Sequence, residues 1–194
     1  MSTTFNKLPQ PDAIARARLA MISEPEDVYD LLKVNPPISL YRLCKDFLNI
    51  NVNLSSDGGD LANSGHIKKD EDGGITIWIN PLDSDNRQRF TLAHELGHYF
   101  LHILRGDQSE FSDTPMEFRR DGQSHKEEVE ANKFAARLLM PSCDIYAEVA
   151  HLVEPDEDGI SPYLSEETLV RELSKTFRVS EMAMQIRLRS LGYL

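Results

Sequence analysis

Two histidines and a glutamate in the run HELGH have the residue types and spacing of a helical metal site. They are His94, Glu95 and His98. Residues four apart project from the same face of an α-helix, so both imidazoles can bind one ion at about 2.0–2.1 Å. Glu95 is turned by about 100° from His94, where its carboxylate can take a proton from a water molecule at the ion. The pattern predicts two ligands of a zinc site and its general base.

A catalytic zinc site usually has three protein ligands, so a third must come from elsewhere in the chain. His102 continues the spacing of four, but it lies about 12 Å along the helix axis from His94, which disfavours it. The helix expected downstream carries Glu127, Glu128 and Glu130. Its apolar stripe places Glu128 on the inner face and Glu130 on the outer face. Periodicity does not exclude Glu127. Glu128 is the preferred third ligand, and Glu127 stays an alternative.

Other residues near the motif suggest supporting roles. Asn132, one turn after Glu128, can hold a ligand side chain in place by a hydrogen bond. Gly97 costs a helix about 1 kcal/mol relative to alanine, which is best explained if another backbone packs closely against that turn. Three residues are of a type that can donate a hydrogen bond to an oxyanion, namely Tyr99, His125 and Arg137. Spacing alone assigns none of them to the site.

Alternation of apolar and polar residues predicts a small antiparallel sheet. The run ITIWI at 75–79 alternates most clearly, residues 50–54 alternate after a short helix, and 66–68 form a weaker strand. Asp-Gly-Gly turn signals flank the weaker strand.

Helical periodicity accounts for most of the remaining chain. A long central helix from about Asn86 to Leu104 contains HELGH, and a second from Ser124 or His125 to Met140 carries Glu128. Residues 105–123 have no clear period and are expected to form a loop. The predicted fold class is α+β, mainly helical, with the metal motif on the central helix.

Three regions are expected along the 194 residues. Residues 1–35 form an N-terminal helical extension, with helices over 11–22 and 25–32. Residues 36–152 form the metal-binding domain. Residues 153–194 contribute a pair of short amphipathic helices that are expected to pack on the core.

Bulk composition narrows the class of partner. The formal charge of −11 and a pI near 5.0 oppose binding to a phosphate backbone. Residues 165–194 are locally basic and resemble a helix-turn-helix, so DNA binding is disfavoured but possible there. No run approaches the roughly 18 apolar residues of a membrane span, and no secretory signal is evident, so a cytoplasmic location is expected. Cys44 and Cys143 lack metal-ligand spacing.

Two motifs together resemble the ImmA/IrrE family of zinc-dependent peptidases. They are HELGHYFLH and, beginning at Glu128, EVEANKFAARLLMP, and the resemblance spans roughly residues 65–141. It implies a zincin-like domain and gluzincin-like metalloendopeptidase chemistry. In that family the glutamate of an E-x-x-A-N pattern is the third zinc ligand. Here the pattern is met by Glu128, Ala131 and Asn132.

The resemblance also implies a biological role. Several members act on a helix-turn-helix repressor in mobile elements or stress responses, so such a regulator is the expected substrate and partner. The alternative is a zinc-containing DNA-binding or protein-interaction regulator without peptidase activity. Glu95 favours catalysis over this alternative, because a purely structural metal site has no use for a base at that position.

Overall fold

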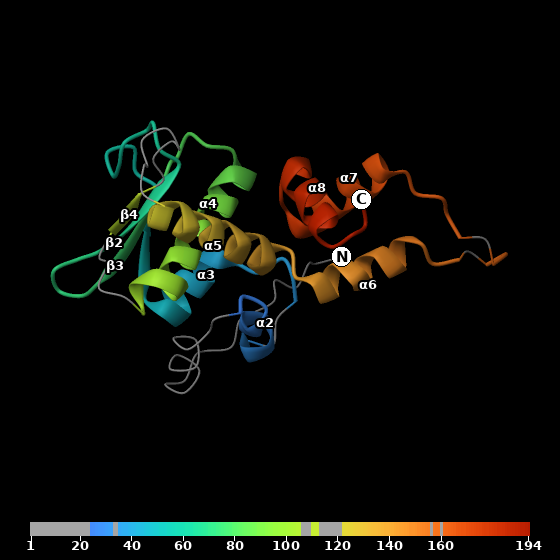
Figure 1. Ribbon diagram of the computed structural model, residues 1–194, viewed down its shortest axis with the longest axis horizontal. Coiled ribbons are helices and arrows are strands. Elements are labelled where there is room, and N and C mark those ends of the chain that lie inside the picture. Colours follow the sequence, from blue (N-terminus) through green and yellow to red (C-terminus); the bar gives the residue numbers. More distant parts are fainter. Residues whose placement is uncertain (1–23, 33–34, 106–109, 113–121, 156, 160) are drawn as a thin grey trace, which may run out of the picture.

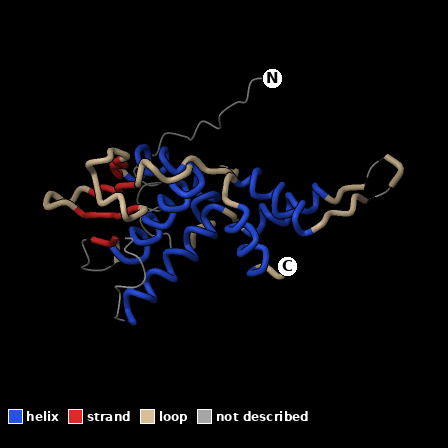
Figure 2. Tube along the Cα trace, turned by 90° about the horizontal axis from the view of Figure 1, so that it is seen from above, coloured by secondary structure: helices blue, strands red, loops and turns tan. Residues whose placement is uncertain are grey.

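The strands gather at one end of the molecule and the helices extend away from them (Figures 1 and 2). The computed structural model describes residues 24–32, 35–105, 110–112, 122–155, 157–159 and 161–194. Over these residues the predicted α+β class, mainly helical with a small sheet, is confirmed.

The sheet is mixed, which corrects the prediction of a wholly antiparallel one. Its order is β1-β3-β2-β4. The hairpin of β2 and β3 is antiparallel and closes through a turn in which Gly73 has φ +85°. β1 pairs in parallel with β3. After β1 the chain crosses the sheet to form β2, and β3 then turns back to lie between β1 and β2. The strands are β1 (Ile50–Asn53), β2 (Gly65–Lys69), β3 (Ile75–Ile79) and β4 (Glu110–Ser112).

The fourth strand lies within the region predicted to be a loop. β4 pairs antiparallel with β2, in a register that places Phe111 opposite Ile67. A strand of three residues leaves too little sequence for a period to appear, which is why periodicity missed it. The rest of that loop, residues 106–109 and 113–121, lies outside the described residues.

The central helix has two parts where the sequence predicted one. α4 (Asp85–His98) is an α-helix that follows Ser84, whose backbone is extended. It continues without a break into η2 (Tyr99–Ile103), a wider π-helical segment in which the Leu104 amide donates to the carbonyl of Tyr99. Phe100 of this segment is fully buried and stacks on Phe134. The metal motif therefore occupies the last α-helical turns.

α4 lies between the sheet and a long helix, α5 (Gly122–Leu139), which begins slightly before the expected start. α4 contacts β2 and β3 on one side and α5 on the other. At Gly97 an added Cβ would stand 2.9 Å from Cα and 3.0 Å from the carbonyl oxygen of Ala131. The prediction that Gly97 serves close packing is confirmed.

The remaining helices share one hydrophobic core with these elements. Val28 and Leu32 of the N-terminal segment and Phe177 and Leu188 near the C-terminus are all buried in it. Serines cap both C-terminal helices: Ser165 accepts from Thr168 N, and Ser180 from Ala183 N. These elements are α2 (Asp27–Leu32), α3 (Leu40–Arg42), η1 (Leu43–Leu48), α6 (Ser142–Leu152), α7 (Glu166–Phe177) and α8 (Glu181–Ser190).

The helix predicted over 11–22 lies outside the described residues, and the division into three regions stays a prediction. No helix in the described part of the chain combines the length and apolar composition that a membrane span requires.

The contact at Gly97 makes a stability prediction. Alanine inside a helix is ordinarily more favourable than glycine by about 1 kcal/mol. Here the new methyl group would meet the backbone of Ala131, which cannot move aside without separating α4 from α5. We expect Gly97→Ala to lower the free energy of unfolding by about 1–3 kcal/mol, measured by equilibrium urea denaturation. A stability equal to or above the parent's would contradict this packing.

Candidate metal centre

The two histidines of HELGH converge, as their spacing predicts. His94 and His98 lie on one face of α4 and are 3% and 1% exposed. Their Nε2 atoms are 3.0 Å apart. Two nitrogens this close inside a protein need a proton or a cation between them, because their partial charges otherwise repel.

Glu128 joins the two histidines from the neighbouring helix. Its Oε2 lies 3.3 Å from His94 Nε2 and its Oε1 lies 3.4 Å from His98 Nε2. An ion bound tetrahedrally at about 2.0–2.1 Å separates its ligands by about 3.3 Å. Both nitrogen–oxygen distances are close to this value, each to a different oxygen of the carboxylate, and the donor set of two imidazoles and one carboxylate suits zinc. The residues present fit a metal ion.

The surroundings favour the protonation states that a metal needs. Burial lowers the pKa of His98, against the opposing hydrogen bond with Glu128, so its ring stays neutral near pH 7. Burial would by itself raise the pKa of Glu128, but the hydrogen bonds with His94 and His98 outweigh it and hold that pKa below its ordinary value. Neutral imidazoles and an ionised carboxylate are the forms that bind metal.

Asn132 orients His94 in the way that the sequence predicted. His94 Nδ1 lies 3.2 Å from Asn132 Oδ1. An amide oxygen only accepts, so the Nδ1–H of the imidazole donates this bond, which fixes the ring with Nε2 facing Glu128. Asn132 itself is exposed at the surface of α5, which differs from the inner position expected of it.

Glu95 is fully buried beside the ligand pair, between α4 and β2. A Cβ added to Gly65 would stand 2.5 Å from Thr91 Cγ2 and 3.3 Å from Glu95 Oε1. The glycine thus allows β2 to pass close to the Glu95 carboxylate. Sequence reasoning missed Gly65 as part of the site. The available signal was a lone glycine opening a strand, which often marks a close backbone approach.

The neighbouring candidates for the third ligand are not part of the cluster. His102 Nε2 lies 3.4 Å from the carbonyl oxygen of Glu127 and 4.0 Å from a carboxylate oxygen of Glu130. Among the described residues, the cluster of metal-binding type comprises His94, His98 and Glu128. It contains none of His102, Glu127 and Glu130.

The three candidate oxyanion donors do not gather at the cluster. Arg137 forms ion pairs with Glu24 and Glu26, on the segment that leads into α2. His125 is exposed in the first turns of α5. Tyr99 is half-buried, and burial raises the pKa of its hydroxyl group. The structure therefore assigns none of them to the site.

Comparison with known proteins identifies the family. Residues 48–189 match the model of a peptidase family described as the IrrE N-terminal-like domain. The chain belongs to this family. The match covers β2, α4 and α5, which carry Gly65, Glu95 and the three clustered residues. Membership of a metallopeptidase family implies a metal cofactor, in agreement with the geometry.

Individual relatives match only in part. The radiation response metalloprotease IrrE of Deinococcus deserti is 42% identical over 66 residues, which is 34% of this chain and 22% of that protein. A solved structure of a Mycobacterium tuberculosis transcriptional regulator has a TM-score of 0.56 at 16% identity, covering 89% of this chain and 46% of the other. The second likeness shows a shared fold. This chain spans less than half of the length of either protein.

The cluster predicts which of the three glutamates binds the metal. We expect Glu128→Ala to weaken zinc binding by more than the roughly 10–100-fold that loss of an outer partner costs, because a direct ligand is removed. The matched variants Glu127→Ala and Glu130→Ala should keep the affinity of the parent. Zinc retained after dialysis, measured by atomic absorption, separates the three. Loss of metal from Glu127→Ala instead would refute the assignment.

The hydrogen bond to His94 makes a second prediction about metal affinity. Asn132→Ala should weaken zinc binding by about 10–100-fold, because the His94 ring loses the acceptor that fixes its orientation. Competition with a chromophoric chelator measures the affinity. Lys126→Ala, an exposed change on the same helix, is the control and should leave it unchanged. Parent-like affinity in Asn132→Ala would show that the bond has no such role.

Proposed function

We propose that this protein is a zinc-dependent endopeptidase of the gluzincin type that hydrolyses peptide bonds in a protein substrate. The observation that carries the proposal is the convergence of His94, His98 and Glu128 from α4 and α5. The two Nε2 atoms are 3.0 Å apart, and each lies 3.3 or 3.4 Å from a carboxylate oxygen of Glu128. A buried carboxylate, Glu95, follows directly in sequence after the first ligand. Membership of the family supports the same chemistry.

The chain's own residues divide the work of hydrolysis. Zinc in this position would act as a Lewis acid, lowering the pKa of water and polarising a carbonyl oxygen. His94 and His98 would bind the ion as neutral imidazoles, and the carboxylate of Glu128 would offset part of the ion's positive charge. Glu95 takes the proton of the attacking water and passes it to the leaving amine. Its burial between α4 and β2 keeps bulk water from competing for that proton.

The composition of the cluster supports a catalytic rather than a structural site. Structural zinc usually has four protein ligands, whereas catalytic zinc has three and an open position. Within the described ranges, the cluster offers three residues. This favours an enzyme over the alternative of a regulator that keeps zinc for structure alone.

The proposed substrate is a helix-turn-helix repressor in the cytoplasm. The support is the resemblance to the ImmA/IrrE family, together with a partial match to a protein named for the radiation response. DNA binding through residues 165–194 stays a prediction. The exposed face of α8 carries Met182 and Ile186, whose side chains cannot pair with phosphates.

Two substitutions separate metal binding from chemistry. Glu95→Gln should keep zinc and lower the cleavage rate by about 10²–10⁴-fold, because an amide cannot accept the proton. His98→Ala should lose both zinc and cleavage. Atomic absorption gives the metal content, and mass spectrometry of a peptide library prepared from a cell proteome gives the cleavage.

The same variants identify the substrate. Zinc-loaded Glu95→Gln should retain an intact protein from the native cell, which the parent cleaves at one mapped bond. A Glu95→Gln variant that cleaves as fast as the parent would contradict the proposed mechanism.

A further inference from the structure

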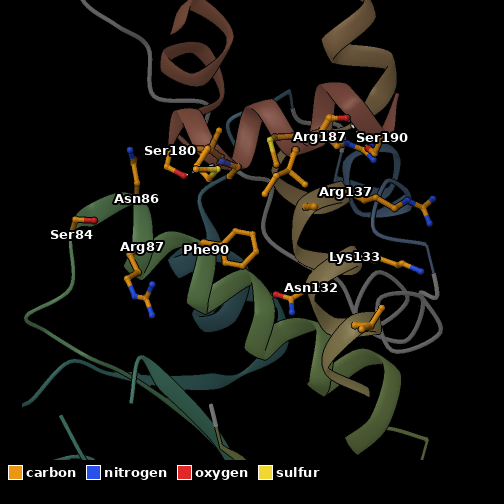
Figure 3. A pocket seen from close by; sticks show the side chains of 17 residues that line it. Ser84, Asn86, Arg87, Phe90, Asn132, Lys133, Arg137, Ser180, Arg187 and Ser190 are labelled. Atoms are coloured by element: carbon orange, nitrogen blue, oxygen red, sulfur yellow. Dashed lines mark hydrogen bonds between the residues drawn. The ribbon is translucent and has the colours of Figure 1, made fainter. Parts of the chain in front are cut away.

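A groove of about 870 Å³ adjoins the metal centre between α4, α5 and α8 (Figure 3). Asn132, which accepts from the metal ligand His94, lines it, and so does Val129, which follows Glu128 directly. Phe90 lines it one helical turn before His94. The groove therefore reaches residues that are hydrogen-bonded to or directly follow the predicted metal ligands. Its volume lies within the roughly 300–1,000 Å³ typical of ligand sites.

Much of the groove wall is apolar. On α8, Met182 and Ile186 lie four residues apart and are 66% and 60% exposed. They face Phe90 of α4 across the groove, and Met140 and Val179 continue the apolar surface. Large apolar side chains left this exposed along one lining mark a binding surface more often than an accident of the fold.

The charged side chains among the described residues of the groove are cationic. They are Arg87, Lys133, Arg137 and Arg187, and none of the described residues that line the groove is acidic, in a chain of net charge −11. Figure 3 shows Lys133 and Arg137 projecting from α5, and Arg187 on α8.

The four cations differ in how far they are already engaged. Arg87 is paired with Asp83. Arg137 is paired with Glu24 and Glu26, and Arg187 donates to the carbonyl of Met140. Lys133 is exposed on α5 and makes no hydrogen bond or ion pair within the described ranges. Its ammonium group is the one best placed to meet an incoming carboxylate.

We propose that the groove binds a segment of the substrate that carries large apolar side chains together with carboxylates, adjacent to the bond that is cut. This inference rests on the proposed peptidase function, and it names the class of sequence that the enzyme selects. Apolar side chains bury against Met182, Ile186 and Phe90, and carboxylates pair with Lys133 at the rim. The phosphates of a nucleic acid would pair with the cations, but they would leave the apolar side chains exposed to water.

Binding to two labelled peptides tests the groove without catalysis. Zinc-loaded Glu95→Gln is titrated with a short fluorescein-labelled peptide of alternating leucine and glutamate, and with its leucine–lysine counterpart. Fluorescence anisotropy should show about tenfold tighter binding of the glutamate peptide, weakened by added salt. Equal binding of both peptides would overturn the proposal.

Variants of the rim and the wall localise the effect. Lys133→Glu, added to the Glu95→Gln protein, should weaken binding of the glutamate peptide by about fivefold, because attraction becomes repulsion. Ile186→Ser should weaken it by about tenfold through lost apolar burial. The matched controls are Lys45→Glu and Leu82→Ser, exposed changes outside the groove, and both should bind like the parent. If the groove variants also bind like the parent, the groove is not the site.

Cleavage by the wild-type protein separates failure of this inference from failure of the proposed function. The sequences around the bonds cut in the proteome-derived library should be enriched in apolar and acidic residues. Cleavage without that enrichment, in bonds that Lys133→Glu cuts equally well, would overturn the inference and leave the peptidase intact. Peptide preference without any cleavage would instead count against the proposed function. Duplex DNA that binds at Lys133 more tightly than the glutamate peptide would overturn the inference.

Discussion

The close approach of α4 and α5 at Gly97 and Ala131 is the constraint on which the site depends. Backbone atoms of Ala131 lie only 2.9–3.0 Å from where a Cβ of residue 97 would stand, so the two helices pack closely at this point. Glu128 lies one turn before Ala131, so this separation sets its distance from His94 and His98. A larger residue at the contact would move the carboxylate away from both imidazoles at once.

That approach also concentrates polar groups inside an apolar core. His94, Glu95 and His98 are buried among residues that form the main hydrophobic cluster, where an uncompensated charge is costly. Burial lowers the pKa of His98 there, while hydrogen bonds with both histidines hold the pKa of Glu128 below its ordinary value. A divalent cation resolves this conflict better than protons do. The protein thus pays in stability for a site that is already arranged for metal.

Local sequence predicted the helices and the strands, but not their pairing. The alternation of ITIWI and the helical run around HELGH depend on neighbouring residues, and both elements formed where expected. The parallel pairing of β1 with β3 joins segments separated by a whole hairpin, so no local pattern encodes it. β4 is too short to show a period. No change in residue types marks the point after His98 where the α-helix becomes a π-helix, so the sequence predicted one helix.

By itself, the sequence determined the residue types and their spacing: two histidines on one helical face, a glutamate beside them, and a glycine that only close packing could explain. Helix geometry is local, so these relations hold wherever the helix lies. Periodicity left Glu127 and Glu128 as alternatives, because choosing between them depends on the rotation of α5 against α4. The family motif pointed to Glu128, and the tertiary structure places its carboxylate beside both histidines. Only the tertiary structure decided the passage of Gly65 beside Glu95 and the groove that α8 completes. Each of these joins segments far apart in the chain, whose distance is set by packing.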